Sequence, residues 1–319
     1  MPFEIHGLTV DLNGECGCDV AWKRQCVPTL APAPRSGVSL ESRPGGIWTH
    51  QIFNDVVSGI TACCFSTSPD GRHVVLRSRE WAGEGALLDV FSEPVMRTVL
   101  FRQGLISFHA AALVKEGQAI LLMGPKGAGK SSVCAALLEH GWLVLADDLV
   151  RLTESGGTWQ AHAGRRQVKL NADVALALGH RPAAMKRRWA ECVDETAGNK
   201  RILEAGARPL CASSYPVRTI FALAVRDSAR TSLTVTMPPS SDQVRLLFAN
   251  ATPDPGGRGR PPAGFSTAVS ALLTQCQVRS LLLPDRLSEL PNAAFAIDVL
   301  VSHRLRQSTG QSLSGVRGE

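Results

Sequence analysis

The chain has 319 residues, of which 44% are hydrophobic and 19% are charged. This composition is ordinary for folded domains and excludes a collagen-like or low-complexity chain, and the length suggests two domains. The apolar runs are far shorter than the roughly 18 residues of a membrane span, and the first residues lack the basic start and apolar stretch of a secretory signal. We therefore expect a cytoplasmic protein without a transmembrane helix.

The nine cysteines form no C-x-x-C pair. Their odd number favours reduced thiols over a disulfide framework. A zinc site made of His6, Cys16, Cys18 and Cys26 is an alternative, but C-x-C followed by a seven-residue gap is not a common zinc spacing.

The net charge is +6, and most of the excess lies between residues 165 and 201, where nine Lys and Arg residues accompany four Asp and Glu residues. Such a stretch is either a solvated face or a surface for phosphates or an acidic partner. Nucleic acid is not expected as a partner, because the chain has a single Tyr and no aromatic residues interleaved with these charges.

Residues 1–100 are predicted to form an N-terminal mostly β module. Turn residues separate short apolar segments that favour strands, and a Pro- and Ser-rich passage favours a loop. The predicted strands are 5–12, 47–54, 59–66 and 73–78, and the predicted loop is 27–39.

From residue 101 to 305 the pattern alternates between strands and helices, which indicates an α/β domain. Residues 306–319 are polar and rich in Gly and Ser, and they are predicted to be a disordered tail. The predicted strands are 107–114, 118–123, 142–146, 217–225 and 232–237; the predicted helices are 130–140, 183–192 and 240–249; residues 168–179 are a strand running into a short helix, and 252–265 a mobile loop.

One segment fits the phosphate-loop pattern G-x-x-x-x-G-K-[ST] at every fixed position, with an apolar strand before it and a helix after it. Its glycines allow backbone N–H groups to surround a phosphate, and the helix N-terminus adds a positive dipole end. Lys130 is expected to reach the phosphates of ATP and Ser131 to ligate Mg²⁺. The predicted nucleotide-binding residues are Gly124, Pro125, Lys126, Gly127, Ala128, Gly129, Lys130, Ser131 and Ser132.

Asp147 and Asp148 follow the next predicted strand, at the end where ligands bind in open α/β sheets. One carboxylate can hold Mg²⁺ and the other can accept the proton of an attacking hydroxyl. An acidic turn at a strand end is the structural alternative.

Three further residues are candidates. His109 lies on the predicted strand before the phosphate loop, where it is either a hydrogen-bonded core residue or part of the site. Lys200 and Arg201 follow a glycine and could donate to the γ-phosphate, or belong to a solvated basic turn.

The segment 107–152 resembles the catalytic core of the HPr serine kinase/phosphorylase family: a histidine in an S-x-H-like strand, the phosphate loop, a short helix, a glycine and a strand ending in A-D-D. The resemblance implies an α/β P-loop kinase core of the HPr kinase type that uses ATP and Mg²⁺. It also implies that Asp147 takes the proton of a serine hydroxyl, that Asp148 supports it or the metal, and that His109 lies beside the transferring phosphate. Homo-oligomers are common in this family.

The chain lacks the family's later E-I-R-G signature and carries Pro125 and Lys126 in the loop. It therefore looks more like divergent relatives that phosphorylate a serine of a natural-product precursor peptide, as in lasso peptide tailoring. The alternatives are a kinase of HPr or another phosphocarrier, an ATPase that drives transport, and a non-catalytic nucleotide-binding regulator.

Overall fold

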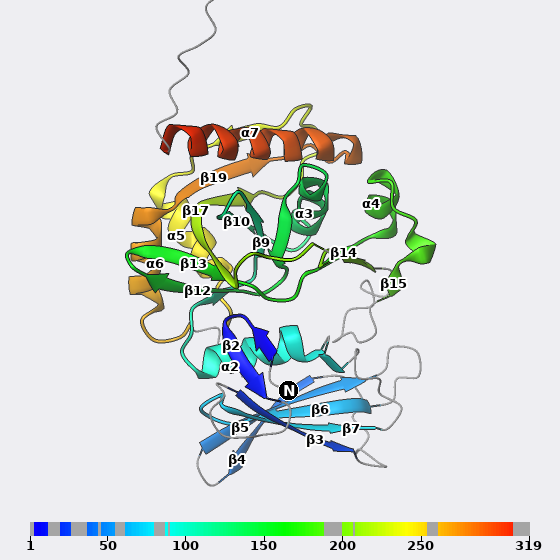
Figure 1. The fold of residues 1–319 in the computed structure, drawn as a ribbon, viewed down its shortest axis with the longest axis vertical. Helices are drawn as coiled ribbons and strands as arrows, with labels where there is room; N and C mark the ends of the chain where they lie inside the picture. Colours follow the sequence, from blue (N-terminus) through cyan, green and yellow to red (C-terminus); the bar gives the residue numbers. More distant parts are fainter. Residues whose placement is uncertain are drawn as a thin grey trace, which may run out of the picture.

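The computed structural model describes residues 3–11, 20–26, 37–43, 46–54, 61–79, 87–88, 90–187, 200–206, 208–253 and 261–308. Figure 1 shows a β-sheet with a helix across it and, beside them, a larger body of strands and helices. The fold is thus mixed α/β, as predicted at that level. Among the helices within these ranges, none is long and apolar enough to cross a membrane.

The N-terminal sheet has seven strands in the order β1-β2-β3-β7-β6-β5-β4. The predicted strand 5–12 is wrong as a single strand, because His6 and Gly7 adopt positive φ angles of 53° and 66° and turn the chain into a hairpin. Residues 37–39, predicted as loop, belong to β4, and 27–36 lie outside the described residues. The strands are β1 (Phe3–Ile5), β2 (Leu8–Asp11), β3 (Val20–Cys26), β4 (Gly37–Arg43), β5 (Gly46–Asn54), β6 (Thr61–Thr67) and β7 (His73–Ser78).

A helical segment, η1 (Phe91–Val95) followed by α2 (Met96–Arg102), packs on this sheet. Its apolar side chains share one buried cluster with Phe65 and Leu76 of the sheet. Gln51 of β5 accepts a hydrogen bond from Thr98 at 3.0 Å and donates one to the Pro94 carbonyl at 3.0 Å. The domain boundary near residue 100 stays a prediction.

The larger sheet runs β11-β9-β10-β17-β13-β12-β8, with β19 beside β17 and β18 beside β19. Strand β10 pairs antiparallel with β9 and parallel with β17. The predicted strand 107–114 is interrupted: it forms β8 and β9, and His109 lies between them rather than on a strand. The strands are β8 (Ser107–Phe108), β9 (Ala111–Lys115), β10 (Gln118–Met123), β11 (Leu143–Ala146), β12 (Val150–Ser155), β13 (Thr158–His162), β17 (Ser214–Leu223), β18 (Thr234–Thr236) and β19 (Gln277–Leu282).

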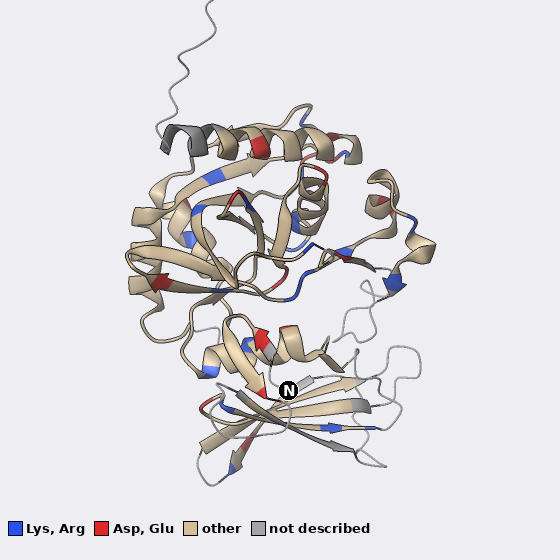
Figure 2. Cartoon of the chain, viewed as in Figure 1, with Lys and Arg blue, Asp and Glu red and all other residues tan. Residues whose placement is uncertain are grey.

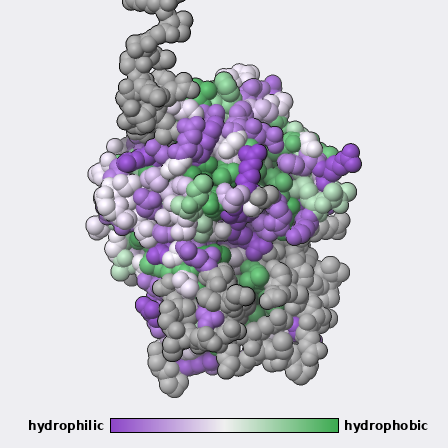
Figure 3. All heavy atoms as spheres, viewed as in Figure 1, coloured by the Kyte–Doolittle hydropathy of each residue, from purple (hydrophilic) through white to green (hydrophobic). Residues whose placement is uncertain are grey.

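Helices cover both faces of this sheet. One buried cluster joins α3 (Lys130–Leu138) and α7 (Leu290–Ser308) to the sheet, and a second joins α6 (Phe265–Gln275) and Leu247 of α5 (Ser240–Ala249) to the opposite face. Because α7 continues to Ser308, the tail predicted from residue 306 begins too early; 309–319 and residues 254–260 of the predicted mobile loop lie outside the described residues. Hydrophilic residues predominate on the side of this body seen in Figure 3, with smaller hydrophobic areas among them.

A third sheet, in the order β14-β16-β15, lies beside α3 and contains β14 (Gln167–Leu170), β15 (Lys186–Arg187) and β16 (Arg201–Glu204). The helix predicted over 183–192 is wrong in its described part. After the short helical turn η2 (Pro182–Ala184), Lys186 and Arg187 pair with β16, and a strand 15 residues away in sequence is invisible to local helix periodicity. Helix α4 (Ala172–Ala177) follows β14 as predicted.

Candidate functional site

The predicted phosphate loop joins β10 to α3 and crosses the end of β17. Gly124, Gly127 and Gly129 adopt positive φ angles of 149°, 87° and 95°, which explains why glycine occupies all three positions. A Cβ on Gly124 would lie only 2.3 Å from the Leu223 carbonyl oxygen of β17. The tip, Pro125 to Gly127, is exposed, whereas Ala128 is buried. The sequence therefore builds a loop whose tip faces solvent on a rigid, close-packed base.

Lys130 closes this loop from within. Its ammonium donates to the carbonyls of Gly124 at 2.6 Å and Pro125 at 3.3 Å, and the residue is buried. Burial lowers the pKa of Lys130, while the charges of Asp148 and Asp147 act in the opposite direction. Ser131 and Ser132 follow, half-buried, in the first turn of α3. A charged amine beside a loop of this shape is suited to an incoming phosphate.

Asp147 lies at the end of β11 and is buried. Its Oδ1 accepts a hydrogen bond from the Asp148 backbone N–H at 3.1 Å, and its Oδ2 has no hydrogen-bond partner among the described residues. Burial, and then the neighbouring charge of Asp148, raises the pKa of Asp147 to about 8. The carboxyl group is thus poised to exchange a proton near neutral pH.

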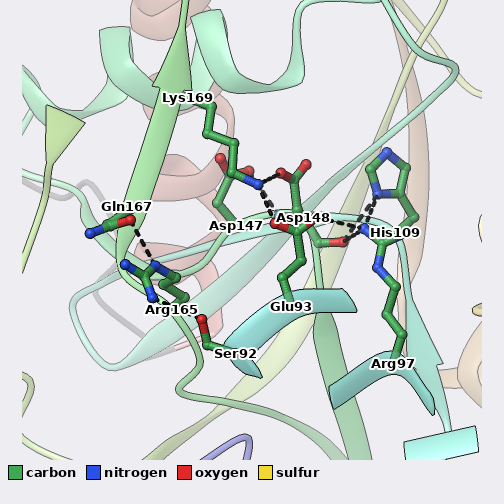
Figure 4. A network of polar contacts seen from close by, with 9 residues as sticks. All are labelled: Ser92, Glu93, Arg97, His109, Asp147, Asp148, Arg165, Gln167 and Lys169. Carbon is green, nitrogen blue, oxygen red and sulfur yellow. Dashed lines mark hydrogen bonds and ion pairs between the residues drawn. The ribbon is translucent and has the colours of Figure 1, made fainter. Parts of the chain in front are cut away.

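Asp148 has the opposite electrostatic environment. Burial alone would raise its pKa, but the ammonium of Lys169, whose Nζ lies 2.5 Å from Oδ2, outweighs burial and holds the pKa well below its ordinary value. Figure 4 shows Lys169 between Asp148 and Glu93. Asp148 has a φ of 67°, and the next residue, Leu149, is buried in the cluster of the N-terminal sheet. Two adjacent aspartates therefore differ in protonation.

His109 also contacts this turn. Its backbone N–H donates to the Asn250 carbonyl at 2.7 Å, and its Nδ1 lies 3.1 Å from the Asp148 carbonyl oxygen. A proton on Nδ1 would bond that carbonyl, which only accepts, whereas a lone pair on Nδ1 would accept from Arg97, whose Nη2 lies 3.4 Å away. Burial, and then the nearby charge of Arg97, lowers the pKa of His109, so the ring is neutral at pH 7. Sequence analysis left two possibilities for His109, a hydrogen-bonded core residue or part of the site. The residue is hydrogen-bonded, and one of its contacts is with the turn that carries the two aspartates.

The basic stretch divides among several roles. Lys200 lies close enough to Lys130 for its charge to lower the pKa of that amine, whereas Arg201 donates to the Pro182 carbonyl at 3.2 Å, away from the loop. Lys186 is exposed and pairs with Glu204. Figure 2 shows the cationic residues around the β14–β16–β15 sheet. Of the cationic residues that the structure describes in this stretch, only some therefore border the loop.

Sequence analysis did not identify several residues that shape this site. Glu93 and Arg97 come from the helical segment before the core, where their i,i+4 ion pair at 3.2 Å is the one local signal. Asn250, at the end of α5, lies with its Oδ1 3.4 Å from the Gly124 N–H. Arg226, just after β17, packs its guanidinium against Gly129 and has a buried Nε for which the described part of the chain offers no hydrogen-bond partner.

Comparisons with known proteins point to two likenesses. A family model described as "SynChlorMet cassette protein ScmC" matches residues 82–165. Among solved structures, the chain is similar to the Hpr(Ser) kinase/phosphatase from Coxiella burnetii, with 15% identity, a TM-score of 0.30, and coverage of 64% of this chain and 94% of that chain. No curated protein matches. The segment matched by the family model contains His109, the phosphate loop and both aspartates.

We predict that Gly124→Ala destabilises the protein by more than about 2 kcal/mol, because the new methyl group meets a rigid backbone carbonyl of β17. Gly141→Ala is the matched control, with a φ of 80° and open space around its Cβ, so only backbone strain of about 1 kcal/mol is expected. Urea unfolding measures both; equal losses in the two variants would contradict this account of the loop.

The buried Asp147 carboxyl predicts a pH-dependent stability. Since its pKa is raised on folding, its contribution is present below pH 4 and is lost as the pH rises towards about 8. Asp147→Asn keeps the acceptor for the Asp148 N–H without the ionisation, so at pH 8.5 it should raise the free energy of unfolding relative to the wild type by about 1–3 kcal/mol, and by much less at pH 5. Urea titrations without nucleotide or metal measure this; the same pH slope in both proteins would refute it.

Proposed function

We propose that the protein is an ATP- and Mg²⁺-dependent phosphotransferase that moves the γ-phosphoryl group to a serine hydroxyl of a peptide or small protein. The observation that carries the proposal is the pairing of a phosphate loop with two aspartates of unlike protonation, close enough for both to act on the pKa of Lys130. Phosphoryl transfer requires positioning, charge neutralisation and a group that accepts the hydroxyl proton. The arrangement contains a residue for each task.

The residues present fit a magnesium nucleotide. Ser131 and Asp148 offer the oxygen ligands that Mg²⁺ prefers, and Lys130 holds its ammonium on loop carbonyls that a phosphate can replace. When bound, Mg·ATP supplies the phosphoryl group and neutralises part of its charge. Lys130 and Lys200 then orient the phosphates through charge, and Arg226 supports the loop at Gly129.

Asp147 is the proposed base. Its Oδ2 is buried and has no hydrogen-bond partner within the described ranges, so an acceptor hydroxyl can donate to it directly. Asp147 acts as a base only in its ionised form, which is populated as the pH approaches about 8, and in that form a carboxylate with a raised pKa takes up a hydroxyl proton more readily than an ordinary aspartate. His109, neutral and bonded to the Asp148 carbonyl, keeps the turn that carries both carboxylates in place.

The acceptor class rests on the sequence resemblance. A serine of a natural-product precursor peptide is the proposed acceptor, with HPr or another phosphocarrier as the alternative. Assembly into a homo-oligomer is proposed on the same grounds. The cytoplasm is the proposed compartment, independently of the resemblance.

Incubation with γ-labelled ATP, Mg²⁺ and paired peptides that carry Ser or Ala at one position tests this function. We expect label on the Ser peptide only. Free phosphate without phosphopeptide would instead indicate an ATPase, and nucleotide binding without turnover a regulator; either result would overturn the kinase proposal.

Two variants test the assigned roles. Lys130→Met should reduce kcat at least about 100-fold, because it removes a cation that neutralises the transferring phosphate. Asp147→Asn should lose transfer to a similar extent but keep the wild-type affinity for nucleotide, measured by calorimetry, because the phosphate cradle is intact. Lys186→Met, an exposed lysine away from the loop, is the control; full activity in Lys130→Met would remove the loop from the mechanism.

A further inference from the structure

Lys169 occupies the position of a cation on the Asp148 carboxylate. The ammonium lies 2.5 Å from Oδ2 of Asp148 and also contacts Oε2 of Glu93, and the three side chains are only 10%, 20% and 14% exposed, respectively. They come from three separate elements, β14, the end of β11 and η1, and Figure 4 shows them converging. The fold therefore holds one amine between two carboxylates.

This amine competes with any metal for the same oxygen. A magnesium ion binds carboxylate oxygen at about 2.0–2.1 Å. At that distance, an ammonium still in contact with the same Oδ2 would be a few ångströms from the ion, where like charges in a partly buried site repel strongly. Metal binding to Asp148 thus requires Lys169 to withdraw from this carboxylate.

Glu93 gives Lys169 a partner to retain when it withdraws. Glu93 is itself fixed by Arg97, whose Nη2 lies 3.2 Å from Oε1, and Arg97 also donates to the Asp148 carbonyl at 3.2 Å. The lysine can therefore leave Asp148 without becoming an unpaired buried charge. A metal ion that arrives with a nucleotide is also held by the phosphates, so it can displace Lys169 from Asp148 more readily than a free ion can.

We propose that Lys169 and Glu93 make metal binding at the site dependent on nucleotide: Lys169 excludes free divalent cations from Asp148 and yields to a cation that arrives with a nucleotide. This inference rests on the proposed function in taking Asp148 as the metal ligand and the loop as the nucleotide site, but not on phosphoryl transfer. It assigns Lys169 and Glu93 as positioning residues.

Binding of Mn²⁺, a spectroscopic substitute for Mg²⁺, tests this inference. The full-length protein is titrated with Mn²⁺ alone and with Mn²⁺ plus ADP, and free Mn²⁺ is followed by electron paramagnetic resonance. Wild type should bind Mn²⁺ alone weakly and Mn²⁺ with ADP tightly. Lys169→Met should lower the Kd for Mn²⁺ alone at least about tenfold and shrink the difference made by ADP.

Three variants serve as controls. Lys186→Met removes an exposed lysine from the same small sheet and should leave both Kd values unchanged. Adding Asp148→Asn to Lys169→Met should return Mn²⁺ binding to the weak wild-type level. Lys169→Arg keeps the cation and should keep the weak binding of free Mn²⁺. An unchanged Kd in folded Lys169→Met would overturn the inference.

If Lys169→Met does not fold, Glu93→Gln is measured in its place. This variant keeps the lysine but weakens its second partner, so withdrawal from Asp148 becomes harder, and Mn²⁺ binding in the presence of ADP should weaken several-fold; wild-type binding would contradict the proposal. These readouts do not depend on phosphoryl transfer. A Kd shift without phosphopeptide would refute only the kinase function, and phosphopeptide without a Kd shift would refute only the inference.

Discussion

Two adjacent carboxylates at a buried strand end can coexist only if their charges are divided or compensated, because each raises the cost of ionising the other. In this protein the pKa values of the two carboxyl groups are shifted in opposite directions. Asp148 receives the Lys169 ammonium and is ionised, while burial and the charge of Asp148 raise the pKa of Asp147 despite the opposing charge of Lys169. A single φ of 67° at Asp148 separates the two environments. The proposed base and the proposed metal ligand thus lie on one backbone turn.

That turn depends on the N-terminal sheet as well as on the α/β body. Leu149, directly after the pair, is buried in the cluster that contains Phe65 and Leu76. Glu93 and Arg97 reach the pair from η1 and α2, which β5 fixes through the hydrogen bonds of Gln51. A left-handed, non-glycine residue costs free energy and persists only where its surroundings enforce it. The sheet therefore contributes to the site's geometry although its strands supply none of the proposed catalytic groups.

The sequence was sufficient for features that neighbouring residues decide. A glycine-rich loop between a strand and a helix, and the buried strand before Asp147, follow from glycine positions, helix spacing and apolar runs, and the structure contains both; phosphate binding by that loop stays a prediction. The sequence was insufficient for features that depend on contacts between segments far apart in the chain. The helix predicted over 183–192 is replaced by pairing with β16, and the strand expected through His109 is interrupted where that residue bonds to Asn250. Glu93 likewise carries no local sign that it reaches Lys169, 76 residues later.

The basic stretch illustrates the same limit for charge. Arg166 donates from Nε to the Val144 carbonyl at 2.7 Å, and Arg165 donates to Ser92 at 2.9 Å, so both guanidinium groups join parts of the fold. Lys169 compensates a carboxylate inside the site. Several cations of this segment therefore bind groups within the protein and are not available to a partner. Of the remaining lysines, Lys200 lies close enough to the loop for its charge to lower the pKa of Lys130, whereas Lys186 is exposed and paired with Glu204. An acidic acceptor bound at the loop would therefore be recognised by the few cations near it, and their positions would matter more than the net charge of the stretch.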